Sequence, residues 1–146
     1  MSTRAWALIV GGVIPAVVLG CFGFLQKASV KNGATPAVFM TVAGFTIGLC
    51  GLVHWLGGGA AVPGWRTVLV CAATGLAWFV GVSLVVVAVQ RFDASISQLT
   101  PLYNMNTLVV VALGMLVYAE HKDVRPLPLI VGAVLVILGG ALVARA

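Results

Sequence analysis

Long apolar stretches separated by short polar segments dominate the chain. Five such runs cover residues 5–26, 34–56, 67–90, 95–119 and 127–143. They are continuous, without the alternation of apolar and polar positions that is typical of barrel strands. Since about 20 apolar residues, each rising about 1.5 Å, cross a bilayer core about 30 Å thick, the pattern predicts an all-α integral membrane bundle of five transmembrane helices.

The segments between these runs are short and carry charges or helix-breaking residues, as in Gly57-Gly58-Gly59 and Arg91-Phe92-Asp93. Successive helices are therefore expected to be antiparallel neighbours. No segment is long enough for a soluble domain. The sequence thus predicts one transmembrane domain over residues 1–146.

The composition agrees with a lipid environment. Hydrophobic residues make up 62% of the 146 positions and charged residues only 8%, against about 25% charged residues in soluble domains. The net charge of +5 comes from basic residues scattered singly along the chain. Nucleic-acid binding needs a basic patch, so it is excluded, and lysine and arginine are expected to flank the membrane spans.

Five spans place the basic residues evenly on the two sides of the membrane. The side of the N-terminus carries Arg4, Arg66, Lys122 and Arg125, and the other side carries Lys27, Lys31, Arg91 and Arg145. A balance of four against four gives no preferred orientation under the positive-inside rule. Either the insertion machinery or a partner fixes one orientation, or the chain inserts both ways.

Dual insertion would suit half of a transporter. Many secondary transporters contain two inverted halves with the substrate site between them near the bilayer midplane. An odd number of spans is what such a half needs, and the chain contains no persuasive internal repeat. We therefore expect an antiparallel homodimer, or a pair with a homologous subunit, in the lipid bilayer.

The fourth apolar run opens with the densest polar stretch of any span. At about 100° per residue, five of its side chains fall within about 120° of one another: Ser97, Thr100, Tyr103, Asn104 and Thr107. This face either lines a substrate cavity, with Tyr103 stacking on a small molecule and Asn104 hydrogen-bonding it, or makes hydrogen bonds to other helices.

Residues outside the fourth span are also candidates for the substrate site. Gln26 and Lys27, at the end of the first span, are expected to reach the same cavity, although Lys27 is equally suited to snorkel to the headgroups. Trp78 lies in the middle of the third span and either packs in the bundle or faces the cavity. Pro15 and Pro101 each remove a helical hydrogen bond, which predicts kinks that serve as hinges or only as packing curvature.

Enzyme chemistry is not expected. The chain has three acidic residues and two histidines, all at span ends or in loops, and they form no metalloprotease, P-loop or serine-triad pattern. No catalytic residue, metal or cofactor is predicted. Cys21, Cys50 and Cys71 lie within apolar runs without a second ligand at metal spacing, so they are interpreted as small hydrophobic residues.

Several short motifs resemble the EamA-like domain of the drug/metabolite transporter superfamily. Thr100-Pro101-Leu102 is similar to the start of that domain's fourth helix, Glu120 to the acidic residue that closes it, and Gly132 through Gly139 to its glycine-patterned fifth helix. Gly20-Cys21-Phe22-Gly23 with Lys27 resembles the first helix more weakly.

The resemblance implies a half-sized, five-helix member of the bacterial and archaeal branch, one half of an inverted-repeat transporter. Such a protein would lie in the cell membrane as a multi-pass protein, in bacteria the inner membrane, and would export or exchange small metabolites or drugs. Two alternatives stay open: a membrane scaffold or assembly subunit that transports nothing, and a flippase of a lipid-linked sugar.

Overall fold

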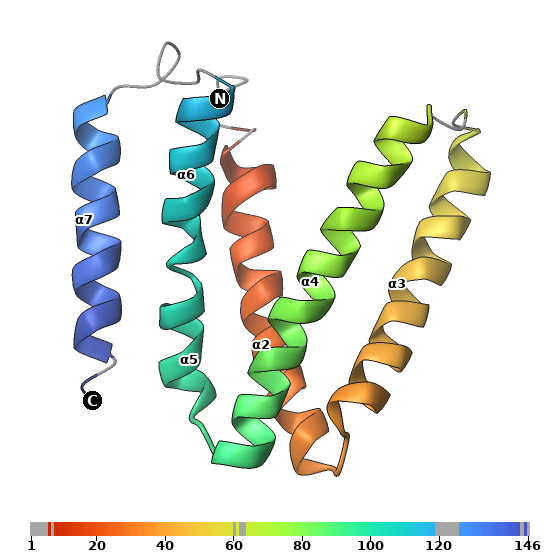
Figure 1. Ribbon diagram of the computed structural model, residues 1–146, viewed down its shortest axis with the longest axis horizontal. Coiled ribbons are helices and arrows are strands. Elements are labelled where there is room, and N and C mark those ends of the chain that lie inside the picture. Colours follow the sequence, from red (N-terminus) through yellow and green to blue (C-terminus); the bar gives the residue numbers. More distant parts are fainter. Residues whose placement is uncertain are drawn as a thin grey trace. The chain divides into compact units, whose positions relative to one another are not determined.

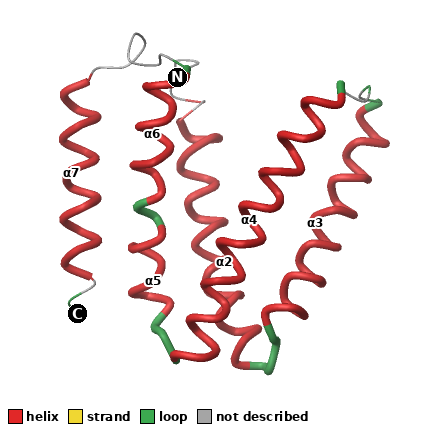
Figure 2. Tube along the Cα trace, in the orientation of Figure 1, coloured by secondary structure: helices red, strands yellow, loops and turns green. Residues whose placement is uncertain are grey.

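The computed structural model describes residues 6, 8–59, 61, 64–118, 126–143 and 145. Every regular element within these ranges is a helix (Figures 1 and 2). Four helical segments are long and apolar enough to cross a membrane, and a shorter apolar helix covers Leu127–Val143: the four are Ile9–Lys31, Pro36–Gly58, Trp65–Phe92 and Ile96–Val117. The all-helical prediction is confirmed, and these helices indicate a multi-pass membrane protein. A fifth crossing at 127–143 stays a prediction.

The helices lie in two compact units, covering residues 1–93 and 94–146. The first unit contains a π-helical turn, η1 (Ile9–Val13), followed by α2 (Ile14–Lys31), α3 (Pro36–Gly58) and α4 (Trp65–Phe92). Helix α4 contacts both α2 and α3. Because α3 runs back along the unit, α2 and α4 point in the same direction (Figure 1).

The second unit contains α5 (Ile96–Tyr103), α6 (Asn106–Val117) and α7 (Pro126–Val143). Helices α5 and α6 follow each other along one span, and α7 contacts α5. The closest approach is at Gly140, where a Cβ atom would lie 2.8 Å from Met105 Sδ. Glycine therefore lets α7 reach the junction between α5 and α6.

The boundaries of α3 have local causes. Thr35 precedes the helix with extended backbone, and its Oγ1 accepts a hydrogen bond from the Val38 N–H at 3.3 Å. Pro36 follows at the first helical position, where a missing N–H costs nothing. At the other end Gly59 adopts φ of 60°, a left-handed conformation, and its N–H donates to the Trp55 carbonyl at 3.1 Å. Glycine reaches this conformation without strain, so it ends the helix.

Irregular helix geometry accompanies both prolines. Ahead of Pro15, the Ile14 N–H donates to the carbonyl of Ile9, five residues back, which forms the wide turn of η1. A proline ring pushes away the carbonyl four residues before it, so a widened turn at this place has a direct steric cause.

The fourth span is interrupted at Asn104 and Met105, three residues beyond Pro101. The Met105 N–H donates to the Leu102 carbonyl and the Thr107 N–H to the Asn104 carbonyl, each at 3.1 Å. This three-residue spacing is tighter than that of an α-helix. The uninterrupted span expected over 95–119 is therefore two consecutive helices as far as Val117, and Ala119 lies outside the described residues.

Most apolar side chains of the described helices face outward. Buried apolar side chains are restricted, in the described ranges, to Met40, Val86 and Val89. Of the most apolar stretch of α3 or α4, only 6% is buried. Water would not tolerate such continuous apolar surfaces, so lipid or other protein chains must cover them.

Candidate functional site

The contact between α2 and α4 buries a polar side chain. Gln26 is 1% exposed and is the one buried polar residue in the described part of the chain. Its Nε2 donates to the carbonyl oxygen of Val82 across 3.5 Å. That separation is near the outer limit for a hydrogen bond, and a buried amide without good partners is costly. The Gln26 amide is thus held inside the helix pair by a weak bond.

Ser83, the residue after Val82, adds a second polar group. Its Oγ is buried and has no hydrogen-bond partner. Other hydroxyls in these helices donate to a carbonyl three or four residues back in their own helix: Ser29 to Leu25, Thr46 to Val42, Thr74 to Val70 and Thr107 to Asn104. Such back-bonding is how a hydroxyl is satisfied in lipid. Ser83 departs from it, and native structures rarely leave a buried hydroxyl unpaired.

Three aromatic rings lie close to these polar groups. The Phe22 ring lies 6.1 Å from the Trp78 ring and 6.4 Å from the Phe39 ring, between centroids. Phe22 precedes Gln26 by four residues and Trp78 precedes Val82 by four, so the rings lie one helical turn from the Gln26 bond. We call Phe22, Gln26, Phe39, Trp78 and Ser83 the aromatic-amide cluster.

A groove of about 270 Å³ adjoins the cluster. Its lining comes from Ser29 of α2, Ala34 before α3, and four α3 residues: Val38, Phe39, Val42 and Ala43. Phe39 belongs to both the groove and the cluster. Phe22, Gln26 and Ser29 fall within about 60° of one another around α2, so they share the helix face that the groove follows.

The polar residues predicted for the fourth span lie in the second unit. Ser97, Asn104 and Thr107 are exposed, whereas Thr100 and Tyr103 are half-buried. The Thr107 Oγ1 donates to the Asn104 carbonyl at 3.0 Å, so this hydroxyl is already engaged. The tight turn at 104–105 rotates Thr107 about the axis relative to an uninterrupted helix, and the predicted single face does not continue unchanged into α6.

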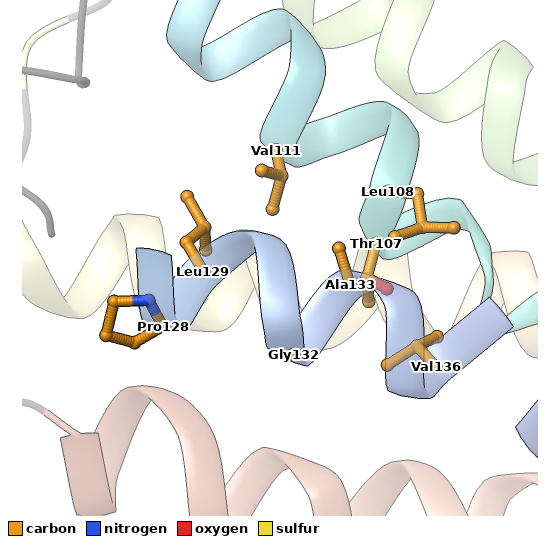
Figure 3. A pocket seen from close by; sticks show the side chains of 8 residues that line it. All are labelled: Thr107, Leu108, Val111, Pro128, Leu129, Gly132, Ala133 and Val136. Atoms are coloured by element: carbon orange, nitrogen blue, oxygen red, sulfur yellow. The ribbon is translucent and has the colours of Figure 1, made fainter. Parts of the chain in front are cut away.

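A second groove, also of about 270 Å³, lies between α6 and α7 (Figure 3). Its lining is apolar apart from Thr107: Leu108, Val111, Pro128, Leu129, Gly132, Ala133 and Val136. Because the Thr107 hydroxyl bonds within its own helix, this groove offers shape and apolar contact rather than hydrogen bonds.

The predicted site residues therefore fall into two groups. Gln26 and Trp78 come together in the first unit through Val82 and Phe22, and Lys27 is half-buried beside Gln26. Phe22, Phe39 and Ser83 were not predicted. The four-residue spacing of Phe22 and Gln26 could have indicated Phe22, whereas nothing local singles out Ser83. A cavity shared by both groups stays a prediction.

Acidic and basic residues contribute little to either group. Arg4, Glu120, His121, Lys122, Asp123 and Arg125 lie outside the described residues. Across the described ranges, no three His, Cys, Asp or Glu side chains gather where they could hold a metal ion. The cysteines at 21, 50 and 71 are unpaired and exposed. The chemistry of the described sites is that of aromatic rings, amides and hydroxyls.

Comparisons of the chain with protein-family models, curated proteins and solved structures find no match. The resemblance to the EamA-like domain thus remains an expectation from short motifs.

Proposed function

We propose that the chain is a secondary membrane transporter that exports or exchanges small metabolites or drugs as an antiparallel dimer. The observation that carries the proposal is the interrupted fourth span. Helices α5 and α6 meet at Asn104 and Met105, and polar residues cluster around this break. Discontinuous helices with polar groups near the interruption are typical of substrate sites in secondary transporters.

The physical argument concerns the cost of polar groups in lipid. Ser97 and Asn104 are exposed in a helix long enough to cross a membrane. Non-helical backbone and polar side chains at membrane depth are tolerated where protein or water covers them. A water-filled substrate cavity meets this requirement.

The antiparallel dimer is supported by charge and by open helix faces. The basic residues divide evenly between the two predicted sides of the membrane, so neither orientation is favoured. Gly44 and Gly48 have no atom within 4 Å of the position a Cβ would take. Their GxxxG spacing on α3 is thus free for a second copy to approach.

Substitution of Asn104 by leucine tests the proposal. The Asn104 side chain is exposed, so the change should leave folding and assembly intact but weaken ligand binding and exchange in proteoliposomes. Val109→Leu, at a site 59% exposed in the same span, serves as the control. A thermal-shift screen of the purified protein against metabolites and drugs identifies the ligand.

Three results would contradict the proposal. Loss of assembly in Asn104→Leu, with normal assembly in the control, would favour a scaffold. Stabilisation by no compound would remove the basis for a transported small molecule. Exchange restricted to lipid-linked sugars would favour a flippase.

A further inference from the structure

The aromatic-amide cluster has a definite chemical character. It holds a carboxamide, a hydroxyl and three rings, and none of its members is ionisable. We propose that it recognises an uncharged solute that combines a planar ring with a carboxamide-like hydrogen-bonding group. This inference rests on the proposed transport function and names the class of substrate.

The hydrogen-bonding groups of the cluster are available for exchange with a ligand. A carboxamide offers two N–H donors and a carbonyl acceptor. Gln26 uses one donor, in a bond of 3.5 Å to the Val82 carbonyl. A ligand carbonyl at about 2.9 Å would be the better acceptor. Ser83 Oγ, one residue further along α4, is buried without any partner and can both donate and accept.

The rings supply a stacking surface. Phe22 contacts Phe39 edge-on and Trp78 at a tilt of 47°, within the centroid distances at which aromatic pairs attract. Trp78 is 37% exposed, so part of its indole stays free. A planar ring fits such a surface better than a saturated ring of the same size.

Space for the solute exists beside the cluster. The groove of about 270 Å³ shares Phe39 with it and runs along the α2 face that carries Gln26. The remaining groove lining is small and apolar apart from Ser29, whose hydroxyl is engaged by the Leu25 carbonyl. A ring-bearing solute in the groove would therefore find its hydrogen bonds on the side of the cluster.

The charge distribution argues against an ionic substrate. The described acidic residue is Asp93, which is exposed and ten positions beyond Ser83, about 15 Å along a helix. A cation at the cluster would have no counter-charge, and an unpaired buried charge is costly. Lys27 is next to Gln26 but about 100° further round α2, so an anion is the informative competitor.

The experiment compares four probes that share one scaffold: benzamide, benzoate, benzylamine and cyclohexanecarboxamide. Binding is measured by calorimetry on the full chain in lipid nanodiscs. Benzamide should bind most tightly, and cyclohexanecarboxamide about fivefold more weakly because it cannot stack. Ser83→Ala and Gln26→Leu should each weaken benzamide about fivefold through a lost hydrogen bond.

Thr74→Val is the matched control, since it removes a hydroxyl of α4 that is engaged within its own helix. Ser83→Ala breaks no hydrogen bond within the chain, so it should fold normally even if Gln26→Leu does not. The inference is overturned if benzamide does not bind, if Ser83→Ala binds it as well as Thr74→Val does, or if either charged probe binds more tightly.

Uptake of the same probes into proteoliposomes separates this inference from the proposed function. Benzamide binding that depends on Ser83, without uptake, would support the site and contradict transport. Uptake of benzylamine or benzoate without benzamide binding would support transport and overturn the substrate class.

Discussion

Substitution of Gly140 by alanine tests the contact that joins α7 to the interrupted span. The new Cβ would lie 2.8 Å from Met105 Sδ, 3.3 Å from Met105 Cγ and 3.9 Å from the Pro101 carbonyl oxygen. Carbon atoms normally pack at about 3.5–4.0 Å. Rotation at the end of the methionine side chain does not clear the space, because Cγ is also too close. Overpacking of this kind costs about 1–3 kcal/mol.

Gly139→Ala is the matched control, because nothing lies within 4 Å of its Cβ position. Both variants gain the same helix preference of alanine over glycine, about 0.5–1 kcal/mol. Their difference therefore isolates the contact with Met105. Gly140→Ala should be less stable than Gly139→Ala by about 1–3 kcal/mol.

The assay is equilibrium unfolding by sodium dodecyl sulfate in mixed micelles, followed by circular dichroism. A second background removes the obstacle: in Met105→Ala the added Gly140→Ala change should cost little, so the two substitutions should be strongly non-additive. The packing argument fails if Gly140→Ala and Gly139→Ala unfold together within about 0.5 kcal/mol.

Three further predictions concern single side chains. Asp93→Gly should raise the free energy of unfolding by about 1 kcal/mol, because Asp93 holds a φ of 49° that glycine adopts without strain; Asp93→Ala should not raise it. Thr35→Ala should lower it by about 1 kcal/mol through loss of the α3 cap, while Thr35→Ser should retain most of it. Phe45 is 72% exposed in α3, so Phe45→Arg should reduce the carbonate-resistant membrane fraction, at about 3 kcal/mol for a charge in the span, and Phe45→Leu should not.

Much of the fold follows from local sequence. Span length and hydropathy depend on consecutive residues, and the apolar runs at 34–56 and 67–90 reappear as α3 and α4 with ends shifted by a few positions. The irregular turn before Pro15 was also predictable, since its cause is the proline ring itself. Helix ends shifted further where a cap such as Thr35 or Gly59 decides them.

The position of the break in the fourth span was not predictable. A lost hydrogen bond at Pro101 indicated an irregularity, but the interruption lies where three-residue bonds replace four-residue ones at Met105 and Thr107. That choice depends on the balance between competing backbone acceptors, which the residue pattern does not encode.

The candidate site was only partly predictable for a related reason. Gln26 was recognisable as a polar residue at the end of an apolar span. Its partner at Val82, and the position of Phe22 between two other rings, depend on how each helix is rotated about its axis. Small differences in packing set that rotation, so residues such as Ser83 emerge only from the three-dimensional arrangement.

The orientation of the chain in the membrane tests the central claim most directly. Two fusions at the C-terminus are compared in the same host, one to alkaline phosphatase, which is active outside the cytoplasmic membrane, and one to green fluorescent protein, which fluoresces inside. An antiparallel dimer of identical chains predicts signal from both reporters. Signal from one reporter alone would contradict dual insertion and the identical inverted partner.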